Sequence, residues 1–264
     1  MTTPTSGHRS ALGADPAGSA PAVAAEPKQA GAEAARARPA LIDGWIIAAA
    51  IAVIAAYVRA IWFTPPEATQ GLAQKIYYLH LPAALNAYLA FGVVFVTSIV
   101  YLWLREERAD RVAEASAEVG LLFTTVVLTT GPIWGKPIWG TWWTWDARLT
   151  LTLFLWFIYA GYIVLRGAIV EPGLRARYSA VLGILGALLI PFIHMSVYLF
   201  RTLHPMPIVL KPSRPSLPPE MLHTLLFSFC AFVLVYLALV RARYRLSLER
   251  ARLAELEASF EGGR

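Results

Sequence analysis

The chain has few of the residues that build disulfide-stapled domains or soluble enzymes. Cysteine occurs once, as Cys230, which excludes a disulfide framework and a C-x-x-C redox motif. Charged side chains make up only 15% of the sequence and hydrophobic ones 57%, so an ordinary soluble fold is excluded. The sequence contains no Gly-rich phosphate loop and no evident nucleophile paired with a base. Any nucleotide chemistry must therefore belong to a partner.

The hydrophobic residues gather into runs that can cross ~30 Å of hydrocarbon as helices of ~20 residues. We expect spans at 41–63, 80–104, 119–130 (starting in the preceding polar linker), 149–165, 180–200 and 221–240. Pro82 is expected in the first turn of the second span, where its missing N–H costs nothing. The predicted fold class is an all-α integral membrane protein with six transmembrane helices.

The two ends of the chain differ from this core in composition. Residues 1–40 are rich in Ala, Pro, Gly and Ser, without the apolar stretch of a cleaved signal peptide, and are expected to form a disordered N-terminal tail. Residues 41–240 form the six-helix domain. Residues 241–264 are expected to be a charged, helical cytoplasmic tail.

The distribution of Lys and Arg predicts the orientation of these spans. Sixteen of the 23 lie on the side of the membrane that holds both termini, against six on the other side. Both termini are therefore expected in the cytoplasm. The Lys and Arg residues are scattered among the short connectors between apolar runs, and this scatter favours contact with membrane lipid over binding of nucleic acid. With six spans, this topology places His80, His204 and the segment between the third and fourth spans together on the outer face.

That segment is the most unusual stretch of the chain, because five of the nine tryptophans fall within residues 134–145. An aromatic belt at the membrane interface explains isolated tryptophans, but explains five in one connection poorly. If the segment forms a short helix, Trp139, Trp142, Trp143 and Asp146 share one face. Such a face would be a platform for a large, flat, partly apolar ligand.

Four histidines lie in or near the outer half of the membrane, and of these His223, at the start of the sixth span, is a weak candidate for function. His80 and His204 stand at the outer ends of the second and fifth spans, and a neutral imidazole is a good ligand for transition metals, including haem iron. Alternatively, each is an ordinary interface histidine bonded to water or to a carbonyl. His194 lies inside the fifth span, where it either makes a structural hydrogen bond near Pro191 or contacts a ligand.

Charged residues near the tryptophans suit an acidic ligand. Asp146 and Arg148 are two residues apart and would not face each other on a helix, so each is expected to have another partner. Arg148, Lys136 and Arg201 are the outer cations best placed for the propionates of a haem, or alternatively for phospholipid.

The motifs together resemble a known family. Residues 134–150, Trp-Gly-Lys-Pro-Ile-Trp-Gly-Thr-Trp-Trp-Thr-Trp-Asp-Ala-Arg-Leu-Thr, resemble the WWD domain of haem-handling proteins. The continuation Asp-Ala-Arg-Leu-Thr is similar to the cytochrome c maturation protein C branch (haem exporter protein C, CcmC). Residues 78–84 and 191–204 support the resemblance, which covers about residues 41–240.

The resemblance implies a site and a role. His80 and His204 would be the axial ligands of haem b. The WWD residues that would bind the cofactor are Trp139, Trp142, Trp143, Trp145 and Asp146, with Arg148 beside them. The protein would lie in the bacterial cytoplasmic (inner) membrane and present haem on the periplasmic face, as a haem-delivery component and not an enzyme.

The resemblance also implies partners. They are the ABC transporter subunits CcmA and CcmB, the small single-span subunit CcmD and the periplasmic haem chaperone CcmE. Two alternatives differ in class. One is a haem lyase, and the other is a transporter in which His194 and Glu118 are intramembrane polar steps.

Overall fold

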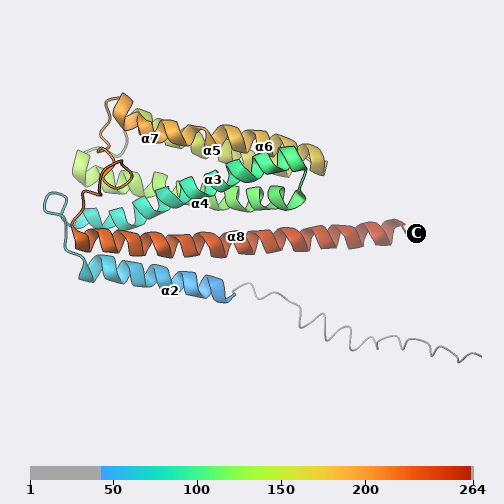
Figure 1. Cartoon of the computed structure of the whole chain (residues 1–264), viewed down its shortest axis with the longest axis horizontal. Helices are drawn as coiled ribbons and strands as arrows, with labels where there is room; N and C mark the ends of the chain where they lie inside the picture. The colour runs from blue at the N-terminus through green and yellow to red at the C-terminus, as the bar shows by residue number, and fades with distance from the viewer. Residues whose placement is uncertain (1–42, 263–264) are drawn as a thin grey trace, which may run out of the picture. The chain divides into compact units, whose positions relative to one another are not determined.

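The computed structural model describes residues 43–262 of the 264-residue chain, and these residues are predominantly helical. The tail predicted at residues 1–40 lies outside the described residues. Figure 1 shows the helices in chain order. Their bounds are Gly44–Val58 (α2), Arg59–Phe63 (η1, a π-helix), Leu72–Ile76 (η2, a 3-10 helix), Tyr77–Leu104 (α3), Glu107–Trp139 (α4), Ala147–Ala168 (α5), Pro172–Ala187 (α6), Leu189–Leu199 (α7) and Pro219–Gly262 (α8).

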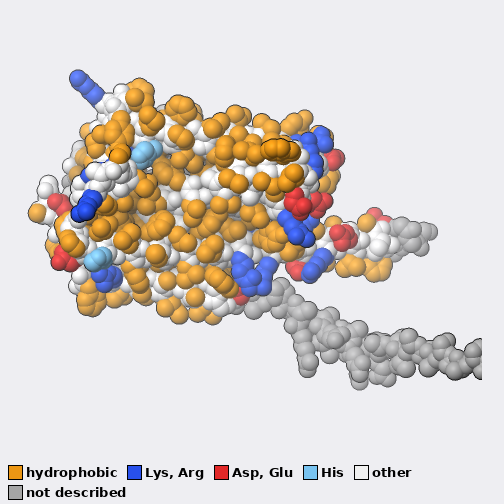
Figure 2. All heavy atoms as spheres, in the orientation of Figure 1, with side chains coloured by type: hydrophobic (Ala, Val, Ile, Leu, Met, Phe, Trp, Pro, Cys, Tyr) orange, Lys and Arg blue, Asp and Glu red, His pale blue; other side chains and the backbone are white. Residues whose placement is uncertain are grey.

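Six helical segments are long and apolar enough to cross a membrane. They are Gly44–Phe63, Leu72–Leu104, Glu107–Trp139, Ala147–Ala168, Pro172–Leu199 and Pro219–Glu261. The prediction of an all-α protein with six membrane-spanning helices is therefore confirmed. In Figure 2, hydrophobic side chains cover most of the surface along these helices, while charged side chains gather toward the helix ends. This distribution is the one that contact with hydrocarbon requires.

Several spans are longer than hydropathy predicts, because their terminal turns carry polar residues. The second starts earlier, at Leu72, so Pro82 lies inside α3 and not in its first turn. The third begins in the polar linker, as expected, but continues as far as Trp139. The sixth runs without interruption from Pro219 to Gly262, so the charged C-terminal segment is helical and continuous with the span.

The fifth span is divided into two helices. Helix α6 ends at Ala187 and α7 begins at Leu189, with Leu188 between them. The cause is Pro191, which has no N–H to donate and whose ring crowds the carbonyl of the residue four positions earlier, Ala187. The span predicted at residues 180–200 is confirmed, although it begins earlier, at Pro172, and contains this irregularity.

Close packing of α3, α4, α5 and α6 forms the centre of the bundle. The rings of Phe91 and Tyr159 stack with their centroids 3.7 Å apart. A Cβ atom on Gly120 would lie 2.5 Å from the Phe91 ring, and one on Gly183 would lie 2.8 Å from a methyl carbon of Val94. Glycine is therefore needed at both positions for the helices to approach this closely.

Three connections lie at one end of the bundle. They are residues 64–71, 140–146 and 200–218. Two contacts join them: the indole Nε1 of Trp134, near the end of α4, donates to Gln70 Oε1 at 3.1 Å, and His204 Nδ1 lies 3.4 Å from Asp146 Oδ2. Segments far apart in sequence therefore meet here. The assignment of this end to the outer face rests on the count of Lys and Arg.

A buried ion cluster joins α5 to α4 toward the other end of the bundle. Arg166 donates from both terminal nitrogens to the two carboxylate oxygens of Asp110, at 2.7 and 2.9 Å, and also to Glu114 at 3.0 Å. Only 6% of the Arg166 side chain is exposed. Because this pairing is bidentate and shielded from water, removing one partner would leave buried charge without compensation.

Replacing Arg166 with leucine should therefore destabilise the protein by about 3–5 kcal/mol, since Asp110 and Glu114 would lose their counter-charge. The measurement is the temperature of half-unfolding in detergent, followed by circular dichroism. Arg111→Ala is the control, because it removes a partly exposed pair with Glu107 one turn away, worth about 0.3–0.5 kcal/mol. Equal shifts in the two variants would contradict the role assigned to the cluster.

Candidate functional site

The tryptophan segment consists of a helix end, a short irregular connection and a helix start. Helix α4 ends at Gly140, whose left-handed backbone (φ 75°) lets its N–H donate to the Lys136 carbonyl at 3.0 Å. Helix α5 begins after Asp146, whose Oδ1 accepts a hydrogen bond from the Leu149 amide at 2.9 Å. The short helix considered for Trp139, Trp142, Trp143 and Asp146 does not form, because of these four residues only Trp139 is helical.

A cavity of about 380 Å³ lies beside this segment. Its size falls within the roughly 300–1,000 Å³ typical of small-molecule and cofactor sites. Six of the predicted site residues line it: His80, His204, Trp139, Trp142, Trp143 and Arg148. Trp145 and Asp146 do not line it. Trp145 is 75% exposed and packs edge-on against Trp143, with ring centroids 5.7 Å apart.

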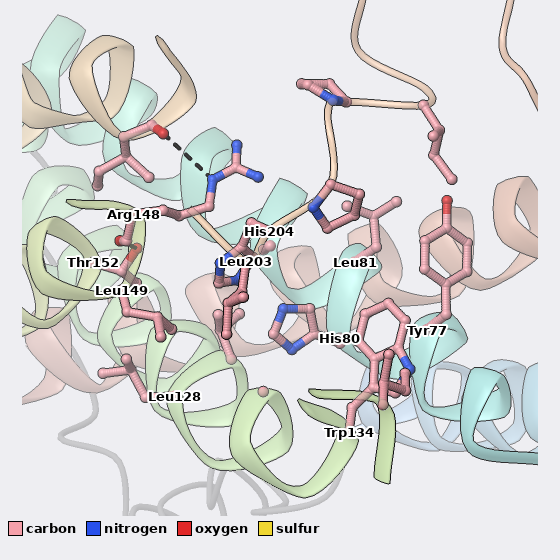
Figure 3. A pocket seen from close by; sticks show the side chains of 18 of the residues that line it. Tyr77, His80, Leu81, Leu128, Trp134, Arg148, Leu149, Thr152, Leu203 and His204 are labelled. Carbon is pink, nitrogen blue, oxygen red and sulfur yellow. Dashed lines mark hydrogen bonds between the residues drawn. The ribbon is translucent and has the colours of Figure 1, made fainter. Parts of the chain in front are cut away.

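The cavity brings together side chains from several elements. Figure 3 shows His80 on α3 beside His204 on the loop after α7, with Trp134 behind His80 and Arg148 beyond His204. Most of the remaining lining is apolar and includes Leu81, Leu128, Leu149, Leu203, Met206 and Ile208. The result is a hydrophobic chamber with three imidazoles, those of His80, His194 and His204, and the guanidinium of Arg148, which suits an amphiphilic ligand.

The hydrogen bonds of His80 determine its tautomer. Its Nδ1 lies 2.9 Å from the hydroxyl oxygen of Thr130, and that hydroxyl donates to the Val126 carbonyl at 2.7 Å. Since the single hydroxyl proton is used on Val126, Thr130 must accept a proton from His80 Nδ1. The Nε2 atom of His80 therefore carries the lone pair. Gly131 leaves room for this ring, because a Cβ there would lie 3.3 Å from His80 Cε1.

His204 has the same tautomer for a different reason. Its Nδ1 faces the Asp146 carboxylate, which can only accept, so Nδ1 holds the proton and Nε2 the lone pair. Burial lowers the pKa of His204, and the Arg148 guanidinium adds to this, although Asp146 opposes both. Burial alone would raise the pKa of Asp146, but hydrogen bonds from Leu149 and Thr202, with nearby His204, bring it below its usual value. At neutral pH the imidazole is neutral and the carboxylate ionised.

Each of the two imidazoles packs against its own tryptophan. The rings of His80 and Trp134 are 5.7 Å apart at an angle of 62°, and those of His204 and Trp139 are 5.2 Å apart at 59°. Gly135 makes room for the second pair, because a Cβ there would lie 2.9 Å from the Trp139 ring. Trp134 and Trp139 thus wall the cavity beside both histidines.

The cations near the cavity differ in how their charge is used. Lys136 donates to the Gly140 carbonyl at 2.8 Å and lies 6.0 Å from the Trp142 ring centroid. Arg148 donates from Nε to the Ile193 carbonyl at 3.4 Å, and no carboxylate among residues 43–262 pairs with it. It lies close enough to the imidazoles of His80, His194 and His204 to act on each electrostatically. Arg148 is thus the cavity's positive group.

Sequence reasoning missed two residues and left the partner of a third open. Trp134 stands five positions before Trp139, on a different face of the helix, so helical periodicity excludes it until the contact with His80 is seen. Thr130 ends an apolar run and gives no signal of its own. Asp146 was expected to have a partner other than Arg148, and the structure places the Leu149 amide and His204 Nδ1 at its two oxygens.

These observations define a multi-pass helical membrane protein with a tryptophan-walled, histidine-containing cavity at one end of its bundle. The chain belongs to the Heme exporter protein C (CcmC) family, because residues 23–259 match the model of that family. The resemblance inferred from residues 134–150 is therefore confirmed.

Relatives that carry the name Heme exporter protein C match most of the chain. The protein from Haemophilus influenzae is 37% identical over 186 residues, which cover 70% of this chain and 76% of the relative. That from Bradyrhizobium diazoefficiens is 36% identical over 213 residues, 81% of each chain. That from Escherichia coli K12 is 36% identical over 231 residues, 84% of this chain and 93% of the relative.

The two tasks of Asp146 can be separated by substitution. Asp146→Ala removes the cap of α5 and should cost about 0.5–2 kcal/mol of stability, whereas Asp146→Asn keeps an oxygen for the Leu149 amide and should cost less. In Asp146→Asn the amide can donate to His204 Nδ1, which should move the imidazole proton to Nε2. Thermal unfolding measures the first effect and ¹⁵N NMR of the labelled histidines the second. An unchanged His204 tautomer in Asp146→Asn would refute the assignment.

Proposed function

We propose that this chain binds haem b between His80 and His204 and presents it for transfer during cytochrome c biogenesis. The observation that supports the proposal most directly is the shared tautomer, in which both Nδ1 atoms face acceptors and both Nε2 atoms keep their lone pairs. An unprotonated imidazole nitrogen is what haem iron takes as an axial ligand. Two such atoms in one apolar cavity could supply both axial positions.

Two histidine ligands suit an iron ion that already has most of its ligands when it reaches the protein, as haem iron does. Among residues 43–262, no three His, Cys, Asp or Glu side chains form a group that could hold a metal ion alone. Haem iron needs only axial ligands from the protein, and the indoles of Trp134 and Trp139 offer flat apolar contact to a macrocycle. Cys230, on α8, does not line the cavity, so haem would be held without covalent attachment.

Arg148 is the residue we assign to the propionates. Its terminal guanidinium nitrogens have no carboxylate partner among the described residues, and it lines the cavity near both imidazoles. Lys136 is a weaker candidate, because its amine already donates to a backbone carbonyl. Among the remaining WWD residues, Trp142 and Trp143 line the cavity and would contact the ligand, while Asp146 would act through His204.

Membership of the family supports a location and a set of partners for the chain. The chain would lie in the bacterial cytoplasmic membrane with its cavity facing the periplasm and both termini in the cytoplasm, as the Lys and Arg count favours. It would pass haem to the chaperone CcmE and work with CcmA, CcmB and CcmD. Because the sequence has no phosphate loop, ATP hydrolysis would belong to these partners, and the chain would deliver haem without catalysing a reaction.

One residue of the alternative transport pathway has a structural partner. Glu118 on α4 forms an ion pair with Arg243 on α8. A paired carboxylate of this kind links two helices, so Glu118 gives no support to a polar pathway through the membrane.

The proposal predicts that His80→Gly and His204→Gly each lose the visible spectrum of six-coordinate haem, because one axial position is left to water. The purified proteins would be loaded with haemin in detergent, and their spectra recorded oxidised and reduced. Adding free imidazole should restore the six-coordinate spectrum in each variant. His223→Gly, an exposed histidine on α8, is the matched control. Wild-type spectra in both His80→Gly and His204→Gly would contradict the assignment of these histidines as ligands.

The same haemin-loading assay tests whether the hydrogen bond to Thr130 supports His80 as a ligand. Thr130→Val keeps the shape of the side chain but removes the acceptor for Nδ1, and should weaken haem retention about 10- to 100-fold, as for other outer-shell partners of metal-bound histidines. Thr130→Ser should retain affinity, since it keeps the hydroxyl. Equal retention by the Val and Ser variants would contradict the tautomer argument.

Arg148 gives a separate prediction with a chemically altered ligand. Arg148→Ala should bind haemin about 10- to 100-fold more weakly, the loss expected for hydrogen bonds to a charged group of about 1.5–3 kcal/mol. The dimethyl ester of haemin, which lacks the carboxylates, should bind wild type and Arg148→Ala equally. Lys136→Ala should leave haemin affinity nearly unchanged. A similar loss for haemin and for its ester would show that Arg148 acts on the fold and not on the propionates.

A further inference from the structure

A second cavity lies beside the first on the flank of the bundle. It is lined by Tyr88, Ile190, Pro191, His194, Val209, Leu210, Lys211 and Pro212. These residues come from α3, from α7 and from the loop before α8. Four of them, Tyr88, His194, Val209 and Leu210, also line the first cavity. The two cavities therefore meet at these side chains.

The flank is open at a level that hydrocarbon would occupy. His194 lies five residues before the end of α7 at Leu199, which places it roughly 8 Å along the helix from that end. The neighbouring side chains Phe192, Met195 and Leu210 are about half exposed or more. Pro191, the residue that divides the fifth span, itself lines the second cavity.

His194 is placed to act on a ligand and not on the fold. Its ring has Tyr198 as an aromatic neighbour at 6.3 Å, and within residues 43–262 it makes no hydrogen bond. The adjacent residue Ile193 accepts the hydrogen bond from Arg148 Nε at 3.4 Å. An imidazole without a structural partner thus stands at the junction of the cavities, next to the group assigned to the propionates.

We propose that the second cavity is a lateral opening through which haem passes from the outer leaflet into the first cavity, with His194 as a temporary iron ligand on the way. This inference rests on the proposed function. The chemistry fits an amphiphilic macrocycle: the rim is apolar on the membrane side, and Lys211 at its edge supplies a positive charge for a propionate. Once iron is bound by His80 and His204, His194 would be left without a role in ligation.

The test is the rate of haem loading, measured separately from the final spectrum. The protein would be placed in phosphatidylcholine nanodiscs and mixed with haemin, and the six-coordinate spectrum followed by stopped-flow absorbance. Pro212→Trp, at a position that lines only the second cavity, should narrow the opening and slow loading several-fold. It should reach the wild-type spectrum, because Pro212 is no part of the haem site. His194→Ala should also slow loading and still reach a six-coordinate spectrum, because His80 and His204 remain.

Leu226→Trp is the matched control, because Leu226 on α8 is exposed like Pro212 but lines neither cavity. Its loading rate should equal that of wild type. Wild-type rates in both Pro212→Trp and His194→Ala would overturn the opening while leaving the haem site standing. A changed final spectrum in His194→Ala would overturn its temporary role and make it a resident ligand. Failure of the wild type to bind haemin would overturn both this inference and the proposed function.

Discussion

The candidate site depends on one carboxylate, that of Asp146, whose two oxygens have different tasks. One oxygen of Asp146 accepts a hydrogen bond from the Leu149 amide, and this bond caps the start of α5. The other oxygen faces His204 Nδ1. The first contact fixes where the fourth span begins. The second ties a loop residue 58 positions further along the chain to that same point. Because the carboxylate can only accept, it also sets which imidazole nitrogen keeps a lone pair. Local helix formation and the chemistry of the cavity thus share a single side chain.

The two ends of the bundle are built for different purposes. Toward one end, Arg166 is buried between two carboxylates, and the adjoining centre is closed by glycines that let the helices touch. Toward the other end, three connections surround a cavity, and the fifth span is broken by Pro191. A cavity forfeits packing contacts that a closed core would have. The dense packing elsewhere offsets this loss, so the protein can keep an open chamber without losing its helical order.

The sequence was sufficient for the topology because hydropathy and charge are properties of the segments themselves. The six spans followed from length and composition, and their number alone brings His80, His204 and the tryptophans to one end. Periodicity failed where backbone conformation changes within a few residues. Gly140 and Asp146 end one helix and start the next, so Trp142 and Trp143 never share a helical face with Trp139. The contacts of Trp134 with Gln70 and His80 depend on tertiary packing, and no local pattern carries them.

The two histidines are supported unequally, and this bears on how a bound ligand would leave. His80 stands in a continuous helix, with Thr130 on its Nδ1 and Gly131 against its ring, so moving it would disturb the packing of α3 on α4. His204 stands in the loop between α7 and α8 and is held by Asp146 and by the face of Trp139. A loop residue can move by rotation of a few backbone bonds, while a helical residue moves only with its neighbours. For a ligand held as proposed, displacement from His204 first would therefore cost less, and it would be the route open to an acceptor that approaches from the connections at this end.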